Sequence, residues 1–185
     1  MLEQMELLEQ VEIAPNIFSM ILKGQMVAQM QAGQFLHIRV PDESKLLRRP
    51  ISIAEIDRDN LTCRIIYRIE GGGTAIFSQL PAGSYLDVMG PQGNGFDLTP
   101  VRSGDQVLII GGGIGVPPLL EVAKELHAKG AQVTAVLGFA DKAALILEKE
   151  MKKYAEVIVT TDNGSYGRKG YVLSLIHISE PTRPY

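Results

Sequence analysis

The chain has 185 residues, 45% of them hydrophobic, which is enough for one large or two small domains that each bury a core. Its formal net charge is −3, so it lacks the broad cationic surface that nucleic-acid binding requires. A single cysteine, Cys63, excludes an internal disulfide and a four-cysteine metal or iron–sulfur site within this sequence.

The N-terminus lacks the basic start and the continuous apolar stretch of a secretion signal. No segment approaches the roughly 20 apolar residues of a membrane span. We therefore expect a cytoplasmic protein with no membrane segment.

The first half of the chain predicts an antiparallel all-β unit, because short alternating or apolar runs are separated by Gly, Pro, Asp and Asn. A short helix is expected at residues 74–80. Six such strands can close into a barrel, which leaves no exposed edge. In the run 61–69 the odd positions are apolar, so Cys63 is expected on the core face of its strand. The expected strands are residues 7–13, 17–23, 34–40, 51–56, 61–69 and 85–90.

A pattern that suits a flavin begins within this unit. A flavin bound on a barrel needs a cation for its pyrophosphate, a flat apolar surface for its ring and a hydrogen bond near its reactive N5 edge. Arg49, Pro50, Ile51 and Ser52 can supply all three through side chains and backbone. Taken alone, Arg49 also fits an ordinary surface arginine.

A second part of the pattern follows on the next strand. Tyr67 is expected to stack on a ring and Arg68 to add positive charge. Gly73 and Thr74 offer backbone N–H groups and a hydroxyl at an expected helix start. A glycine-rich turn of this kind also fits a plain loop. Only the order and spacing of the motifs favour a flavin site.

Beyond residue 105 the pattern changes to strand, turn, helix and strand, which predicts a right-handed parallel unit. Strands are expected at 106–110, 133–137 and 157–161, and helices at 117–129 and 143–154. We therefore expect a flavin-binding barrel over residues 1–98 and an incomplete nucleotide-binding α/β domain over residues 99–172.

A glycine cluster joins the first strand of this α/β unit to its first helix. Its members are Gly111, Gly112, Gly113 and Gly115, whose backbone amides, with the positive helix end, can approach a pyrophosphate. The cluster lacks the third glycine of the GxGxxG fingerprint. It fits either a dinucleotide site or a merely tight turn, and the upstream flavin pattern favours NAD(H).

Three further features leave their alternatives open. Residues 138–142 lack the paired basic cluster that a 2′-phosphate requires, which favours NAD, but Lys142 keeps NADP open. The glycine-rich runs 90–96 and 161–167 fit either cofactor-lining loops or ordinary turns. The three histidines have no metal-ligand spacing.

The last residues do not continue the α/β pattern. The run 173–185 contains two prolines near its end and follows a third strand whose next helix and strand never arrive. It resembles translated adapter sequence more than a protein segment. We therefore expect residues 173–185 to be a non-native tail.

The motifs RRPISI, IIYRIEGGGT, GPQGNGF and GGGIGVPPLLE, in this order, resemble the ferredoxin–NADP reductase family. Within it they resemble the electron transfer subunits of NAD-dependent dihydroorotate dehydrogenases, over about residues 7–172. Ile51 departs from the wider family, which usually has an aromatic residue at this position. The FAD contacts that the resemblance implies are Arg49, Pro50, Ile51, Ser52, Ile66, Tyr67, Arg68, Gly73 and Thr74.

The resemblance also implies a reaction. NADH would give a hydride to FAD, and electrons would pass singly through a [2Fe–2S] cluster to the FMN of a separate dihydroorotate dehydrogenase catalytic subunit in pyrimidine biosynthesis. No acid–base residue is implied, and Ser52 is the one side chain expected to affect hydride transfer directly. The family's CGP-type segment and its C-terminal cysteine cluster are absent. We therefore expect a C-terminally truncated subunit without an iron–sulfur centre.

Two alternatives remain open from the sequence. The chain could be another flavin reductase of the same superfamily, serving a hydrogenase, a sulfite reductase or a ferredoxin. It could also be an inactive fragment in which the flavin motif survives only as fold.

Overall fold

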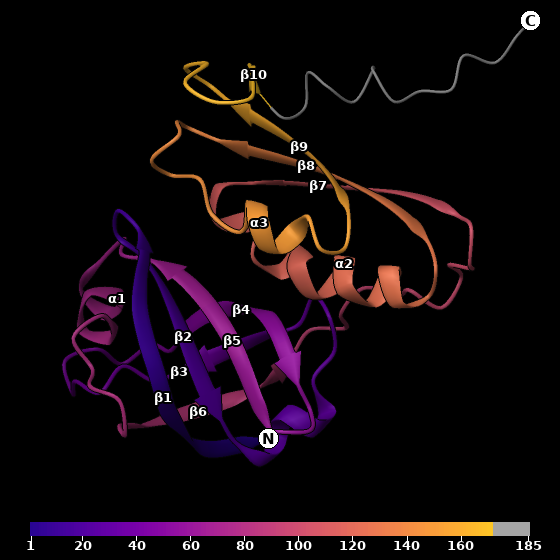
Figure 1. Cartoon of the computed structure of the whole chain (residues 1–185). Helices are drawn as coiled ribbons and strands as arrows, with labels where there is room; N and C mark the ends of the chain where they lie inside the picture. The colour runs from indigo at the N-terminus through magenta and orange to yellow at the C-terminus, as the bar shows by residue number, and fades with distance from the viewer. Residues whose placement is uncertain (172–185) are drawn as a thin grey trace, which may run out of the picture.

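The computed structural model describes residues 1–171, which form a closed antiparallel barrel followed by a parallel sheet (Figure 1). The barrel order is β1-β2-β5-β4-β3-β6. This confirms the predicted six-stranded barrel and its α/β successor. The barrel strands are β1 (Leu2–Ala14), β2 (Ile17–Lys23), β3 (Phe35–Ile38), β4 (Arg49–Asp57), β5 (Thr62–Arg68) and β6 (Tyr85–Gln92).

Alternation of side chains builds the barrel interior. On β5, Cys63, Ile65 and Tyr67 point inward, and on β2, Met20 and Leu22 meet them in the same buried cluster. A period of two places every second residue on the core face. The predicted inward position of Cys63 is confirmed, since the residue is only 1% exposed.

The N-terminal strand is longer than the predicted residues 7–13. β1 begins at Leu2, and its first part pairs with β6 from Leu2↔Met89 to Glu6↔Tyr85. The polar residues of this part do not show a strand pattern in the sequence. The strand is stabilised by pairing with residues about 80 positions further along the chain. A 3-10 helix, η1 (Gln25–Gln29), was also not predicted, and α1 (Gly72–Phe77) replaces the expected helix 74–80.

The second unit is a sheet in the order β10-β9-β8-β7, and all its strand pairs are parallel. Figure 1 shows α2 and α3 between this sheet and the barrel. The barrel strands all end by Gln92 and the sheet begins at Gln106, which supports our proposal of a boundary near residue 98. The elements are β7 (Gln106–Gly112), η2 (Gly113–Gly115), α2 (Pro118–Ala128), β8 (Gln132–Phe139), α3 (Glu148–Met151), β9 (Glu156–Thr161) and β10 (Arg168–Lys169).

The expected helix 143–154 is wrong in extent, since only α3 (Glu148–Met151) forms. Asp141 accepts a hydrogen bond from the N–H of Ala144 at 3.0 Å, so the segment that precedes α3 begins with a turn. Leu147 has a left-handed φ of 62°, which no α-helix continues through. Ile146 and Leu147 are both buried, so packing into the core overrides the local helical pattern.

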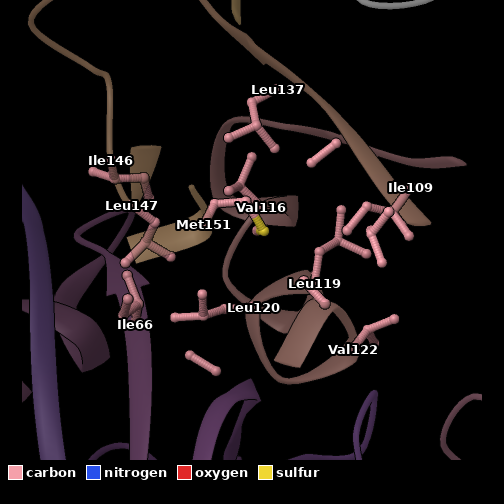
Figure 2. Close-up of a cluster of buried hydrophobic side chains, with 14 of the residues drawn as sticks. Ile66, Ile109, Val116, Leu119, Leu120, Val122, Leu137, Ile146, Leu147 and Met151 are labelled. Atoms are coloured by element: carbon pink, nitrogen blue, oxygen red, sulfur yellow. The ribbon is translucent and has the colours of Figure 1, made fainter. Parts of the chain in front are cut away.

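A second core lies between the barrel and the sheet. Figure 2 shows Ile66, which points outward from β5, beside Leu147 and Leu120 of the α/β unit, and Leu119 and Met151 belong to the same cluster. The barrel therefore packs against the α/β unit through a shared apolar cluster. Residues 172–185, which include the expected tail, lie outside the described part of the chain.

Burial makes a prediction for the cysteine. Burial raises the pKa of the Cys63 thiol to about 12, so about one thiol in ten thousand is ionised at pH 8. We expect no alkylation of the native protein by iodoacetamide at this pH and one equivalent in denaturant, measured by mass spectrometry. Rapid labelling of the native chain would show that β5 opens readily.

Candidate functional site

All the residues that the sequence assigns to a flavin come together around one cavity of about 410 Å³. Such a volume lies in the usual range for small-molecule sites. β4 supplies one wall, the end of β5 a second, and the start of α1 a third. The lining residues are Arg49, Pro50, Ile51, Ser52, Ile66, Tyr67, Arg68, Glu70, Gly71, Gly73, Thr74 and Ile114.

Arg49 is the cation of this cavity that has no acidic partner. Its Nη1 donates to the carbonyl of Leu47 at 2.8 Å, and no carboxylate within residues 1–171 forms an ion pair with it. The neighbouring Arg48 differs, because it binds both oxygens of Asp87 at 3.0 Å. Arg49 is therefore available for an anionic ligand, while Arg48, the residue before β4, binds to β6.

The absence of a side chain at Gly73 leaves room for the guanidinium of Arg49. A Cβ at Gly73 would lie 2.6 Å from Arg49 Nε, a separation that real Cβ atoms do not show. A side chain at Gly73 would therefore displace the Arg49 guanidinium, although the backbone of Gly73 is not in the left-handed region.

Arg68 also lines the cavity, but its charge is shared. Its Nε donates to Glu70 Oε1 at 2.8 Å, and its Nη2 contacts the same carboxylate oxygen. Both side chains are largely exposed, so the pair contributes little to stability. The net positive charge that Arg68 adds to the site is therefore smaller than the sequence suggests.

The expected ring stacking by Tyr67 does not fit the geometry. The residue is 3% exposed, its ring stacks with Phe18 and meets the edge of Phe77, and its hydroxyl donates to Gln10 Oε1 at 2.9 Å. Burial also raises the pKa of the Tyr67 phenol. Strand alternation points this ring into the barrel, so Tyr67 offers mainly its backbone to the cavity, whereas Ile66 points to the outer face of the barrel.

Two hydroxyls of the site differ in availability. Thr74 Oγ1 already accepts from the N–H of Glu70 at 3.1 Å and donates to the carbonyl of Gly71 at 3.1 Å, so it orders the turn itself. Ser52 lies opposite Phe35 on β3, and its hydroxyl makes no hydrogen bond within residues 1–171. Ser52 is therefore free to bond a ligand.

The sequence did not single out Glu70, Gly71 or Ile114 as lining residues. Glu70 and Gly71 lie inside the quoted motif and could have been found there. Ile114 belongs to the glycine turn after β7, about 40 residues further along the chain. No local pattern places it at the cavity, because its position depends on how the α/β unit packs on the barrel.

A second cavity of about 340 Å³ lies at the carboxyl ends of β7 and β8, beside the end of β9. In open parallel sheets ligands bind outside the carboxyl ends of the strands. Gly112 and Gly113 line this cavity, whereas Gly111 and Gly115 do not. Its lining residues are Gly112, Gly113, Gly138, Phe139, Ala140, Asp162 and Tyr171.

An iron–sulfur centre does not fit this chain. The single thiol, Cys63, is buried inside the barrel, and residues 1–171 hold no group of three or more metal-ligating side chains. Four thiolates are needed for such a cluster.

Within residues 1–171 no helix combines the length and hydropathy of a membrane span.

Comparison with known proteins adds a family to this geometry. Residues 4–96 match the family described as oxidoreductase FAD-binding domain. The chain is 67% identical over 174 residues to the electron transfer subunit of dihydroorotate dehydrogenase B (NAD(+)) from Streptococcus mutans, covering 94% of the chain and 67% of that protein. The corresponding Streptococcus pneumoniae subunit is 62% identical, with coverages of 95% and 69%. The chain thus spans about two thirds of the length of these relatives.

Solved structures show the same architecture. A chain of an NADH-dependent reduced ferredoxin–NADP oxidoreductase superimposes with a TM-score of 0.85 at 28% identity, covering 98% of this chain and 64% of that one. A ferredoxin NADP+ reductase from Neisseria gonorrhoeae, solved with FAD and NADP, superimposes with a TM-score of 0.80 at 15% identity, covering 96% and 76%. At the latter identity the likeness shows the fold alone.

Proposed function

Because the chain belongs to the family of electron transfer subunits of dihydroorotate dehydrogenase B (NAD(+)), we propose that it takes electrons from NADH through a bound FAD. Identities of 67% and 62% to these subunits favour this assignment over a flavin reductase that serves a hydrogenase, a sulfite reductase or a ferredoxin. The observation that carries the proposal is the cavity in which every sequence-predicted flavin residue meets.

The residues present fit an FAD. Arg49 offers a guanidinium without a carboxylate partner, and such a fork binds the oxygens of a pyrophosphate with two hydrogen bonds. Gly73 leaves room for that side chain, and the exposed Pro50 presents an apolar surface beside it. Bound FAD supplies the hydride chemistry and the step from two-electron to one-electron transfer.

The chain's own contribution is to bind and to orient. Arg49 would hold the pyrophosphate, Ile66 and the backbone of Tyr67 would border the flavin, and Ser52 would offer its free hydroxyl to the N5 edge of the ring. Ile114 brings the glycine turn to the same cavity, which supports the proposal that a dinucleotide binds at Gly112 and Gly113, next to the flavin. We assign no acid–base residue.

We propose NAD rather than NADP as the second dinucleotide. Lys142 is the basic residue nearest the end of β8, and its Nζ lies 5.8 Å from the centre of the Tyr166 ring in a cation–π contact. Asp141 stands beside it and repels a 2′-phosphate. The names of the relatives also specify NAD(+).

We further propose that the electrons pass to a dihydroorotate dehydrogenase catalytic subunit in a hetero-oligomer in the cytoplasm. The relatives' description as electron transfer subunits supports a catalytic partner. We derive no step through a [2Fe–2S] cluster, because the residues of this chain do not supply its ligands.

A visible absorption spectrum tests the proposal. We expect the purified chain, given FAD, to retain flavin after gel filtration and to bleach when NADH is added without oxygen. NADPH at the same concentration should bleach it more slowly. Absence of bound flavin would refute the flavin site, and bound flavin that stays oxidised would refute the nucleotide site.

A further inference from the structure

Glu121 is the one charged residue of the described chain that is fully buried, with 2% of its surface exposed. It lies on α2 and faces β4. Its Oε2 accepts a hydrogen bond from the backbone N–H of Ile56 at 2.8 Å and a second from Lys124 Nζ at 3.2 Å. Lys124 also donates to the carbonyl of Ile56 at 3.0 Å. Two side chains of α2 therefore bind both polar groups of one residue of the barrel.

The topology explains why Ile56 needs these partners. β3 pairs with β4 only from Arg49 to Ser52, so the rest of that edge of β4 has no neighbouring strand on this side. A buried backbone N–H or carbonyl without a hydrogen bond is costly. Glu121 and Lys124 complete the edge where β3 ends.

A neutral side chain could also form hydrogen bonds with the backbone groups of Ile56 at this edge of β4. Burial raises the pKa of the Glu121 carboxyl, and the N–H of Ile56 and the charge of Lys124 oppose that effect. A carboxylate in such a place is more costly than a neutral group. The hydrogen bonds of Glu121 and Lys124 to Ile56 are directional. They therefore fix the position of α2 along β4 as well as its distance from β4.

The clamp formed by Glu121, Lys124 and Ile56 connects the two cofactor cavities. β4 carries Arg49–Ser52 at its other end, and α2 continues directly from the glycine turn. Leu119, two residues before Glu121, packs so closely on Gly111 that a Cβ there would lie 2.6 Å from its Cδ1. Ile114 of the same turn lines the flavin cavity. Displacement of α2 along β4 would thus move the nucleotide turn relative to the flavin.

We propose that Glu121 and Lys124 are positioning residues that fix the nucleotide turn over the flavin cavity at the distance hydride transfer requires. This inference rests on the proposed function. Neither residue lines the flavin cavity, so their loss should leave FAD affinity unchanged. A misplacement of about 1 Å costs roughly 100-fold in rate.

The test compares Glu121→Leu with Glu121→Gln in the FAD-loaded chain. Leucine removes the acceptor for Ile56, whereas glutamine keeps an acceptor oxygen. We expect Glu121→Leu to slow flavin bleaching at saturating NADH by about 10- to 100-fold, with FAD affinity unchanged. Glu121→Gln should stay within about threefold of the natural chain. The matched control is Glu125→Leu, on the same helix and with no ion pair or side-chain hydrogen bond in the described residues.

Hydrogen exchange gives a readout that needs no activity. In Glu121→Leu the amides of residues 111–116 should exchange faster, while those of β5 keep their protection. Unchanged bleaching and unchanged exchange would overturn the inference. If Glu121→Leu fails to fold, Lys124→Met decides by the same two measurements, with a smaller effect expected. If the natural chain does not bleach, the proposed function fails, and the exchange result still decides the clamp.

Discussion

Replacement of Arg49 by alanine should weaken FAD binding by about 100-fold, or roughly 3 kcal/mol. The guanidinium has no carboxylate partner in residues 1–171, so its removal abolishes charge-assisted hydrogen bonds to the pyrophosphate without freeing a buried acid. Titration of flavin fluorescence measures the affinity. Arg49→Lys should recover part of it, since lysine keeps the charge and loses the fork.

The control for this prediction is Arg39→Ala. Arg39 lies on the same barrel. Its side chain is 63% exposed and its ion pair with Asp87 is long, at 3.9 Å, so its replacement should change FAD affinity little. Gly73→Ala should act in the same direction as Arg49→Ala, because the new methyl group displaces the guanidinium. An Arg49→Ala variant that holds FAD as tightly as the natural chain would contradict the site.

Replacement of Gly111 by alanine should destabilise the α/β unit by about 1–3 kcal/mol. The added Cβ would lie 2.6 Å from Leu119 Cδ1 and 3.1 Å from the carbonyl oxygen of Gly115, so the Leu119 side chain and the backbone of the turn must both shift. The midpoint of thermal unfolding, followed by circular dichroism, should fall by about 2–12 °C. Bleaching by NADH should slow as well, since the turn is displaced.

Gly112→Ala is the matched control in the same turn. Its Cβ would meet only the carbonyl oxygen of Gly138, at 3.7 Å, so stability should not change. Because Gly112 lines the second cavity, the methyl group should instead weaken NADH binding. Equal unfolding midpoints for the two variants would show that the packing of Gly111 on Leu119 is not what keeps this position free of a side chain.

The replacements at Arg49, Gly111 and Gly112 test different parts of the molecule. Arg49 reports on the barrel, Gly111 on the packing of the turn, and Gly112 on the approach of the dinucleotide. A failure confined to Arg49 or to Gly112 would identify which cavity is misassigned.

Alternation and turn chemistry were sufficient to predict the barrel and the α/β unit. β2 (Ile17–Lys23) has the bounds that the sequence predicts, and Cys63 lies on the predicted face of β5. These features depend on side chains one or two positions apart, so the sequence displays them directly. The order of the motifs also predicted which residues of β4, β5 and α1 would share a cavity.

Features that depend on distant contacts could not be predicted in this way. Burial of Ile146 and Leu147 shortens the expected helix to α3, and the ring of Tyr67 turns into the barrel instead of the cavity. Ile114 reaches the flavin cavity only because α2 packs on β4.

The sequence by itself therefore determined the class of fold, the family motifs and the residues with the chemistry to bind a dinucleotide. The tertiary structure decided which of those residues offer a side chain and which only a backbone, and it joined Glu121 to Ile56 across 65 positions of the chain. The physical reason is that local periodicity fixes the face of a strand, whereas the partner of a buried polar group is set by packing between units.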